Sequence, residues 1–548
     1  MNMKKITAQL SIAILLVAGA ASCKKESFNI NQNPNQATDS TIVYNVILPS
    51  AQNNTARLVA RNWGWLQNYM GYWARSGTYA PNTQEETYTL TTSFQAQIWS
   101  AVYDVNYDYE VMRISAEKAG ADFYAGIARI MKAHNSAILV DLYNNAPYSE
   151  ALKGASNSTP KYDKGLDIYK DLLAQIDTGI AQIKNADLNT SGPNKSIGTD
   201  DVMFGTTSAA YQNTPYEQKE LWAKFGNTVK LRLLVHLMNG GVGSNPAGTV
   251  GTPNSYVDEA LIDAELAKID AEGSGYMDFD AEVQPGYQND KRNPFYNLYV
   301  SDNNGSATAN SVYYKANAWG IDYYDYNGDP RQARFYVAGS QGMRGVAYGA
   351  LPITENAAAT LAGIGPGVTR GATAACWIMS AAESYFLQAE AMHRGKMSGD
   401  AKATLANGIR ASFVMVGSTA AAANSYIAGN ATYADVDYDA ASRFGGAPGG
   451  LFTIISQKWF ALNAIAPFEV YTDFRRVDFS STVNHFEYGS SVGYDPGPAI
   501  SVAPGVPADQ ELPVRLLYPQ AEYLYNAGNV GAEGTINAFT SKIFWDRN

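Results

Sequence analysis

The feature that most constrains the fold is an apolar side chain at every third or fourth position, a spacing that recurs in several long stretches. In "ADFYAGIARIMKAHNSAILVDLY" this spacing runs from Phe123 to Leu142, and the pattern ends near Pro147. It returns in "GLDIYKDLLAQIDTGIAQI" and in "LWAKFGNTVKLRLLVHLMNGG", which closes with Gly240 and Gly241. Such spacing places one apolar stripe along a helix, and glycine favours the left-handed backbone that ends one. The sequence therefore predicts a mainly α protein.

Further helices are expected in "CWIMSAAESYFLQAEAMHRGK" and in "IISQKWFALNAIAPFEVYTDFRR", the second with a bend at Pro467. The expected helices come in pairs joined by short turns, and alanine is frequent where neighbours would touch. This favours stacked helical hairpins of the tetratricopeptide type, although no strict repeat of about 34 residues is visible. Long irregular loop tracts, among them 280–330, separate the helices. No linker interrupts the middle of the chain, so residues 41–548 are predicted to form a single composite domain.

Residues 1–22 have the pattern of an export signal. Two lysines precede an apolar run, Leu10–Ala21, of 12 residues, which is too short to span a bilayer. Small residues then lead into Cys23, which resembles the lipobox of bacterial lipoproteins, although Ala20 stands where leucine is usual. The alternative is an ordinary signal with a cysteine by chance. We expect Cys23 to become the lipidated N-terminus.

Residues 23–40 are expected to be the lipidated cysteine and a flexible tether, because asparagine, glutamine, serine and proline dominate there. Each buried CH₂ of an acyl chain such as palmitate contributes roughly 0.8 kcal/mol, so several chains on Cys23 would hold firmly. No later apolar segment reaches about 18 residues. The mature protein is therefore expected to be anchored to a membrane and not to span it.

The bulk composition excludes some classes of function. The net charge of −11 and the pI near 5.0 argue against a nucleic-acid partner held through phosphates. Of the two cysteines, Cys376 is expected to be a buried structural thiol. The histidines show no close pair and no metal-ligand spacing, so neither a metal nor another cofactor is expected. The four are His134, His236, His393 and His485.

The 37 tyrosines and 9 tryptophans suit either a tyrosine-rich core or the binding of sugars and peptides. In "RNWGWLQNYMGYWARSGTYAPNTQEETY" one helical face carries four rings, which are expected in the core: Trp65, Tyr69, Tyr72 and Trp73. Trp63, Tyr79 and Tyr88 lie off that face. They are candidates for ligand contact.

A second aromatic stretch, "VYYKANAWGIDYYDYNGDPR", lies in the loop tract. Trp319, Tyr323 and Tyr324 stand there beside Asn317 and Asp322, whose polar groups could bind hydroxyls. We expect these three rings to be the first ligand contacts, because a large exposed aromatic side chain needs a reason. Contact with a protein partner is the alternative.

The same stretch ends in Asp325, Asn327 and Asp329, which alternate as calcium ligands can. An EF-hand loop has glycine sixth and glutamate twelfth, whereas Gly328 is fourth and Tyr336 twelfth here. A turn is therefore the prediction.

Catalytic motifs are weak. Ser491 in "GSSVG" matches a hydrolase string, but the proline- and glycine-rich sequence after it does not predict the required helix. A glycoside hydrolase stays open, because two carboxylates about 5–9 Å apart would suffice. A scaffolding lipoprotein is a further alternative.

Charged side chains stand beside apolar helix faces in Arg232–Leu234 and in Asp473–Arg476. This arrangement predicts buried ion pairs between helices.

Six stretches in order carry a likeness to a known family: "FNINQNPNQATDS", "RIMKAHNSAILVDLYNNAPYSEAL", "LWAKFGNTVKLRLLVHL", "ESYFLQAEAMHRG", "QKWFALNAIAPFEVYTDFRR" and "LPVRLLYPQAEYLYNAGNV". The chain resembles the SusD/RagB family of nutrient-binding outer-membrane lipoproteins of Bacteroidetes, and more closely its SusD-like branch. The resemblance covers residues 23–548.

This resemblance implies a tetratricopeptide-like scaffold with irregular loops, lipid attachment and exposure at the cell surface. It also implies a SusC-like TonB-dependent outer-membrane barrel as partner, to which the protein would deliver its ligand. That ligand is typically an oligosaccharide in this family, although some members serve peptides or other nutrients. A binding protein, and not an enzyme, is therefore the expectation.

Overall fold

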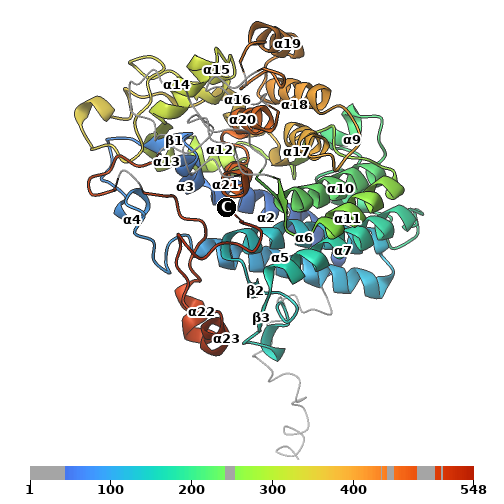
Figure 1. The fold of residues 1–548 in the computed structure, drawn as a ribbon. Coiled ribbons are helices and arrows are strands. Elements are labelled where there is room, and N and C mark those ends of the chain that lie inside the picture. Colours follow the sequence, from blue (N-terminus) through green and yellow to red (C-terminus); the bar gives the residue numbers. More distant parts are fainter. Residues whose placement is uncertain are drawn as a thin grey trace, which may run out of the picture. The chain divides into compact units, whose positions relative to one another are not determined.

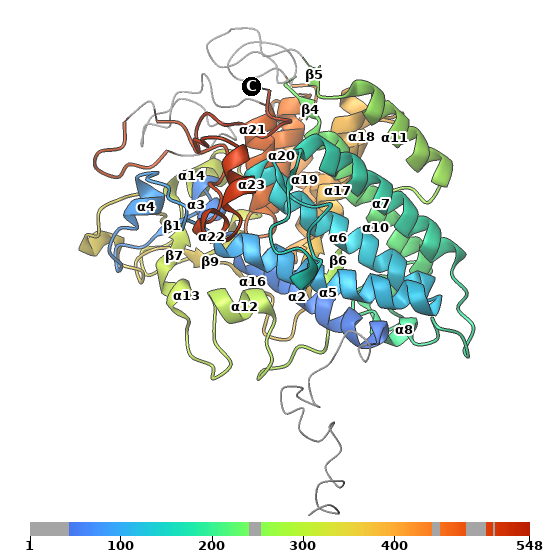
Figure 2. The same cartoon turned by 90° about the horizontal axis from the view of Figure 1, so that it is seen from below.

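Five long helices pack against one another in chain order and form the first part of the scaffold. They are α2 (Tyr44–Arg61), α5 (Gln97–Ala119), α6 (Asp122–Tyr143), α7 (Gly165–Asn185) and α10 (Gln218–His236). Each packs on the next, α2 on α5, α5 on α6, α6 on α7 and α7 on α10. Figure 2 shows them lying side by side. The predicted mainly α, tetratricopeptide-like scaffold is confirmed.

The structure is a computed structural model. It describes residues 43–240, 254–433, 435–440, 450–477, 500–507 and 510–547. Among the residues discussed above, those of the leader and tether up to residue 42, with Cys23, lie outside these ranges, as do Gly241, His485 and Ser491.

A second set of helices continues the scaffold. It consists of α17 (Ala381–His393), α18 (Ala401–Met415), α19 (Ala420–Gly429), α20 (Leu451–Leu462) and α21 (Pro467–Val477). Helix α10 packs on α17, which joins the two sets, and α17 also contacts α18 and α20. In Figure 1 the two sets occupy one side of the fold, and the shorter elements around α13, α14 and β1 occupy the other.

The remaining helices are mostly short. They are α3 (Gly64–Tyr69), α4 (Thr83–Glu86), α8 (Ile197–Asp200), α9 (Ala209–Asn213), α11 (Glu259–Glu272), α12 (Pro294–Tyr299), α13 (Ala309–Tyr313), α14 (Ala318–Tyr326), α15 (Gln332–Phe335), α16 (Pro366–Thr369), α22 (Gln520–Tyr525) and α23 (Ala527–Ala532). The tract 280–330 was expected to be loop, but α12, α13 and α14 lie within it. Asparagine and threonine N-caps start these helices, because their side-chain oxygens accept the free amides of the first turn.

The strands pair antiparallel in five two-stranded sheets within the described residues: β1–β7, β2–β3, β4–β5, β6–β10 and β8–β9. Their bounds are β1 (Trp73–Arg75), β2 (Ala146–Pro147), β3 (Tyr162–Asp163), β4 (Met238–Asn239), β5 (Ser255–Tyr256), β6 (Ala281–Val283), β7 (Tyr314–Ala316), β8 (Tyr336–Val337), β9 (Gly363–Ile364) and β10 (Cys376–Met379). Each short sheet joins two segments of the chain by backbone hydrogen bonds. The sheets do not form a separate layer of the fold.

The start of α17 differs from the sequence expectation. Residues from Cys376 were expected to be helical, but Cys376–Met379 form β10 and the helix begins at Ala381. Ser380 sets this boundary, because its Oγ accepts a hydrogen bond from the Glu383 amide at 3.1 Å. The expectation of a buried thiol at Cys376 is confirmed, and burial raises its pKa to about 12.

Helices α6 and α7 approach each other at a pair of glycines. A Cβ atom added at Gly126 would lie 2.5 Å from the carbonyl oxygen of Gly179, and one at Gly179 would lie 2.7 Å from that of Gly126. These distances leave no room for a side chain on either helix. The two glycines therefore set how closely the helices pack.

The core also holds charged side chains that pair across helices. Arg232 Nη2 lies 2.6 Å from Glu383 Oε1, and its Nε lies 3.4 Å from Glu469 Oε1. His236 contacts the same Glu469 at 3.0 Å and lies 3.3 Å from Asp141. The predicted ion pairing of Arg232 is confirmed. All five side chains are buried.

A neighbouring set of buried ion pairs centres on Arg476. Its guanidinium lies 2.6 Å from Glu390 and 2.6 Å from Asp473. Glu390 also pairs with Arg394 at 2.8 Å, and Asp473 pairs with Lys458 at 2.9 Å. Removing one partner of such a set leaves an uncompensated buried charge, which costs about 3–5 kcal/mol. The predicted ion pairing of Asp473–Arg476 is thus confirmed.

Within the described ranges, no helix is both long and apolar enough to cross a bilayer.

Candidate ligand-binding site

The aromatic side chains that the sequence placed first in a ligand site lie in the core. Trp319, Tyr323 and Tyr324 belong to α14, which Asn317 starts by accepting the Trp319 amide at 3.0 Å. Trp319 is 4% exposed, and its ring crosses that of Trp459 edge to face at 5.1 Å. The expectation of exposed loop residues is therefore wrong. In this structure these three rings present no free face to a ligand.

The hydroxyl groups of Tyr323 and Tyr324 also have hydrogen-bond partners. Tyr324 donates its hydroxyl hydrogen to the Phe460 carbonyl at 2.8 Å, and Tyr323 donates to Asp435 at 3.0 Å. The helix folds onto α20 because its rings bury apolar area there, and the nine-residue length hides this from a periodicity argument.

Trp63 and Tyr88 were likewise expected to be accessible, and both are buried. The Trp63 ring stacks on Phe468 of α21 at 4.9 Å, and the Tyr88 hydroxyl accepts the Ser501 amide at 2.9 Å. The four rings predicted to be core, Trp65, Tyr69, Tyr72 and Trp73, are buried as expected.

Tyr79 is the sequence-predicted ring that the structure leaves partly accessible. It is half-buried, and its ring lies 5.3 Å from that of Tyr313, which is also half-buried. Its hydroxyl donates to the Ala309 carbonyl at 3.3 Å. Arg75 fixes the backbone by donating to the Tyr79 carbonyl at 2.7 Å. Tyr79 and Tyr313 thus form an aromatic pair at the surface, called here the tyrosine pair.

Two carboxylates, Glu85 and Glu86, lie on α4, just after Tyr79 in the chain. Glu86 forms a buried ion pair with Arg75, with Nε and Oε1 2.5 Å apart. Among the described residues, no cation forms an ion pair with Glu85. Burial raises the pKa of Glu85 to about 7, and the charge of Glu86 adds to the rise while a hydrogen bond from Asn68 opposes it.

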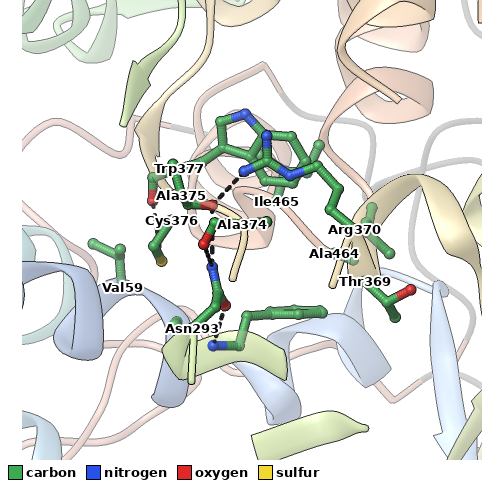
Figure 3. A pocket seen from close by; sticks show the side chains of 13 residues that line it. Val59, Asn293, Thr369, Arg370, Ala374, Ala375, Cys376, Trp377, Ala464 and Ile465 are labelled. Carbon is green, nitrogen blue, oxygen red and sulfur yellow. Dashed lines mark hydrogen bonds between the residues drawn. The ribbon is translucent and has the colours of Figure 1, made fainter. Parts of the chain in front are cut away.

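A separate hollow of about 430 Å³, part of it open to solvent, lies where five segments meet. Helix α2, the start of α12, the end of α16, strand β10 and the turn between α20 and α21 contribute to its walls. Figure 3 shows Trp377 and Arg370 along one side and Asn293 on the opposite side. Because much of this space is open to solvent, the hollow can admit a compact chemical group but does not enclose a whole ligand.

Arg370 and Trp377 form the main feature of this pocket. The Arg370 guanidinium lies 3.6 Å from the centre of the Trp377 ring, an attractive cation–π arrangement. The same guanidinium donates to the Ala375 carbonyl and lies 2.6 Å from Glu282 of β6. Among the described residues that line the pocket, Arg370 alone carries a charge at neutral pH.

The other polar groups of the wall have partners. Asn293 donates to the carbonyls of Ala374 and Ala375, both at 3.0 Å, and its oxygen caps α12. Thr369 donates its hydroxyl hydrogen to the Gly365 carbonyl at 3.1 Å. The remaining wall is largely aliphatic and aromatic, with Val59 and Ile465 among its members. The pocket therefore offers an apolar interior and one cation.

Two positions in the wall have backbone conformations that side-chain-bearing residues seldom adopt. The φ angle is 36° at Arg370 and 62° at Ala464. Non-glycine residues held there cost of order 1 kcal/mol or more and persist where surrounding structure imposes them. The surrounding structure therefore holds the backbone of the pocket wall in place at Arg370 and at Ala464.

The described part of the chain shows no site that could hold a metal ion. No cluster of three or more histidine, cysteine, aspartate or glutamate side chains with metal-site geometry occurs there. Asp329, one of the residues considered for calcium, is buried in an ion pair with Arg331 at 2.6 Å. Cys376 in the pocket wall is kept as a neutral thiol, because burial raises its pKa to about 12.

The pocket could not be predicted from the sequence. Arg370 and Trp377 are separated from Val59, Asn293 and Ile465 by long stretches of chain, so no local spacing connects them. The arginine directly before the glycine in "TRGATAACW" is the one local signal, and it indicates a turn.

Comparison with known proteins gives a consistent result. The family described as "Starch-binding associating with outer membrane", of SusD-like type, matches residues 31–519. A chitin-binding SusD homolog from Flavobacterium johnsoniae superimposes with a TM-score of 0.65 at 20% identity, covering 91% of this chain and 98% of that chain. A SusD-like protein from Bacteroides thetaiotaomicron gives a TM-score of 0.66 at 19% identity, covering 91% and 99%.

A SusD homolog from Bacteroides fragilis gives 0.65 at 19% identity and covers 92% of this chain and 100% of that chain. No curated protein sequence matches the chain. At these identities the superpositions show a shared fold, and the family assignment rests on the match across most of the chain. The protein therefore belongs to the SusD-like family, whose members are described as starch-binding and associated with the outer membrane.

Proposed function

We propose that the protein is a cell-surface lipoprotein that binds a nutrient, first of all an oligosaccharide, and passes it to a SusC-like TonB-dependent transporter. The observation that carries the proposal is the family match over residues 31–519. The family description names starch binding and association with the outer membrane, and one solved homolog is named as chitin-binding. The proposed activity is therefore binding without turnover.

Attachment to the membrane is proposed to run through Cys23. The apolar leader and the polar tether after the cysteine support this. An acylated cysteine would account for association with the outer membrane without a spanning segment. Exposure on the outer surface follows if the protein delivers ligand to a transporter there.

The tyrosine pair is proposed as a contact for the oligosaccharide. A tyrosine ring offers an apolar face for the C–H side of a sugar and a polar edge for its hydroxyls. Tyr79 has a partly exposed ring, and Arg75 holds its backbone in position. The ring is thus pre-arranged, so its ordering costs little on binding.

The binding proposal is tested by calorimetric titration of the mature protein with maltooligosaccharides and with chitooligosaccharides. Saturable heat with at least one series, and no shortened products by mass spectrometry, is the expected result. Tyr79→Ala should weaken that binding, whereas Tyr107→Ala, which changes an exposed tyrosine on α5, should leave it unchanged. Product formation would establish the alternative of a lipid-anchored glycoside hydrolase.

The transporter is tested separately. Tagged protein extracted with detergent from outer membranes of its own cells should co-purify with a barrel that mass spectrometry identifies as TonB-dependent. Recovery of the protein alone, under conditions that preserve membrane complexes, would argue for a binding or scaffolding role without delivery. Binding of peptides in the first assay, with no response to glycans, would identify a peptide-binding lipoprotein.

A further inference from the structure

We propose that the pocket bordered by Arg370 and Trp377 binds a compact carboxylate, with the Arg370 guanidinium as its charged contact. This site is built from residues other than the tyrosine pair. The proposal therefore does not depend on oligosaccharide binding there, and the two can fail independently.

The first argument is the charge of the pocket. Arg370 is the one charged side chain among the described lining residues, and the side chain is 26% exposed. The contacts described for its guanidinium, to the Ala375 carbonyl and to Glu282, are made by Nη2. Nε and Nη1 form no hydrogen bond to any described residue. Two donors of the guanidinium fork are therefore available to an anion.

The second argument is that the fork is held in place. Trp377 stacks on the guanidinium at 3.6 Å, and the Ala375 carbonyl accepts a hydrogen bond from its Nη2 atom. In Figure 3 the Arg370 side chain reaches toward Trp377 and Ala375. A planar guanidinium fixed in this way loses little freedom when a carboxylate binds, and paired N–H···O bonds make that contact specific.

The third argument is what the rest of the wall lacks. Asn293 and Thr369 already use their donors on backbone carbonyls, so they are poorly placed to recognise several hydroxyls. The other surfaces are mainly apolar, with Val59 and Ile465 among them. A ligand that fits has one anionic group for Arg370 and a compact body for the apolar interior. Hydroxyls inside the apolar interior would lack partners, so a sugar could bind here only with a carboxylate on Arg370 and its hydroxyls toward solvent.

Glu282 has a defined part in this proposal. Its carboxylate lies 2.6 Å from Arg370 Nη2 and partly neutralises the charge of the guanidinium. An incoming carboxylate then has to compete with Glu282 for the same cation. Removing the charge of Glu282 should consequently increase affinity, an effect that damage to the fold would not produce.

A carboxylate of this kind could come from an acidic sugar or from the C-terminus of a peptide. The experiment therefore uses two matched pairs, glucuronate against glucose and N-acetylalanine against its amide. In each pair the carboxylate is replaced by a neutral group. Binding to the mature protein is followed by saturation-transfer NMR and calorimetry at low ionic strength, where charge contacts are least screened.

We expect at least one carboxylate to bind, with its neutral counterpart weaker by about tenfold or more. Arg370→Gln should remove that preference, and Glu282→Gln should tighten carboxylate binding. Arg292→Gln is the matched control, because Arg292 also lies over an aromatic ring, that of Tyr296 at 5.7 Å, but does not line the pocket. Thermal unfolding of each variant checks that it is folded.

The pair that responds identifies the source of the carboxylate. Equal binding of acid and neutral partner in both pairs, or no binding of either acid, would overturn the proposal. So would carboxylate binding that persists in Arg370→Gln or weakens in Glu282→Gln. Failure of the oligosaccharide titration, with a positive result here, would reject the proposed nutrient class and leave this site standing.

Discussion

Gly126 of α6 and Gly179 of α7 contact each other through their backbones, since a Cβ on either would lie within 2.7 Å of the other's carbonyl oxygen. We predict that Gly126→Ala forces the helices apart and lowers the free energy of unfolding by about 1–3 kcal/mol. Urea denaturation followed by circular dichroism measures the change. An unchanged midpoint would mean that the two helices can separate without loss.

The control for this substitution is Gly531→Ala in α23, where an added Cβ meets no atom within 4 Å. Alanine is the better helix former by up to about 1 kcal/mol. The control should therefore be neutral or slightly stabilising.

Trp319→Ala is predicted to destabilise the protein, because the ring is buried against Trp459 and Gly71. Truncating a buried tryptophan costs about 3–5 kcal/mol. Tyr79→Ala, at a half-buried ring, should cost much less while weakening oligosaccharide binding. Thermal denaturation and titration on both variants separate the two effects. If Trp319→Ala were as stable as the wild type but no longer bound the ligand, α14 would be a ligand site as the sequence predicted.

The charge of His236 should give stability that depends on pH. Burial by itself lowers the pKa of His236, but the carboxylates of Glu469 and Asp141 outweigh it and raise the pKa. A raised pKa stabilises the fold fully below the unfolded value, about 6.5, and this contribution is lost as pH rises through the folded value. The cost of His236→Gln, measured by urea denaturation, should thus be largest near pH 6 and smaller at pH 9. A cost that grows with pH would contradict this.

Glu85 should oppose folding at alkaline pH. Its folded pKa of about 7 lies above the unfolded value of about 4.3, so the folded state holds a proton that the unfolded state releases. Stability is therefore lost as pH rises from about 4 to 7. Glu85→Gln should be more stable than the wild type at pH 8, by of order 1–4 kcal/mol, with a smaller difference at pH 5. Equal differences at both values would show that Glu85 is not titrating in the fold.

Replacement of Cys23 tests the proposed anchor. Cys23→Ser removes the sulfur that would carry the first acyl chains, so the protein should no longer incorporate labelled palmitate or sediment with outer membranes. Cys376→Ser is the matched control, since it removes the buried cysteine and leaves the anchor. Membrane association that survives Cys23→Ser would point to another means of attachment.

The sequence predicted the long helices well and the short ones poorly. In α6 and α7 the apolar spacing persists for 22 and 21 residues, which is enough to distinguish a helix from other structures. Helix α14 has nine residues, and Asp322 and Asp325 are the polar side chains on its outer face, which is too short a pattern to establish a helical period. Its buried rings were therefore mistaken for exposed ones.

The site was hidden for a different reason. The pocket joins α2, α12, α16, β10 and the turn before α21, and contacts between such distant segments depend on tertiary packing. Even the local structure at Cys376 was misjudged, because Ser380 as an N-cap, and not the apolar run before it, decides where α17 starts. Buried ion pairs at Arg232 and Arg476 were easier to foresee, since charges on apolar helix faces need partners.

The buried ion pairs around Arg476 have a consequence for how related sequences can diverge. Glu390 is shared by Arg476 and Arg394, and Asp473 is shared by Arg476 and Lys458. Loss of one cation therefore leaves both carboxylates with a second partner, whereas loss of Glu390 removes the ion pair of Arg394 and loss of Asp473 removes that of Lys458. We expect the two carboxylates to change in related sequences only together with the cation that each of them pairs.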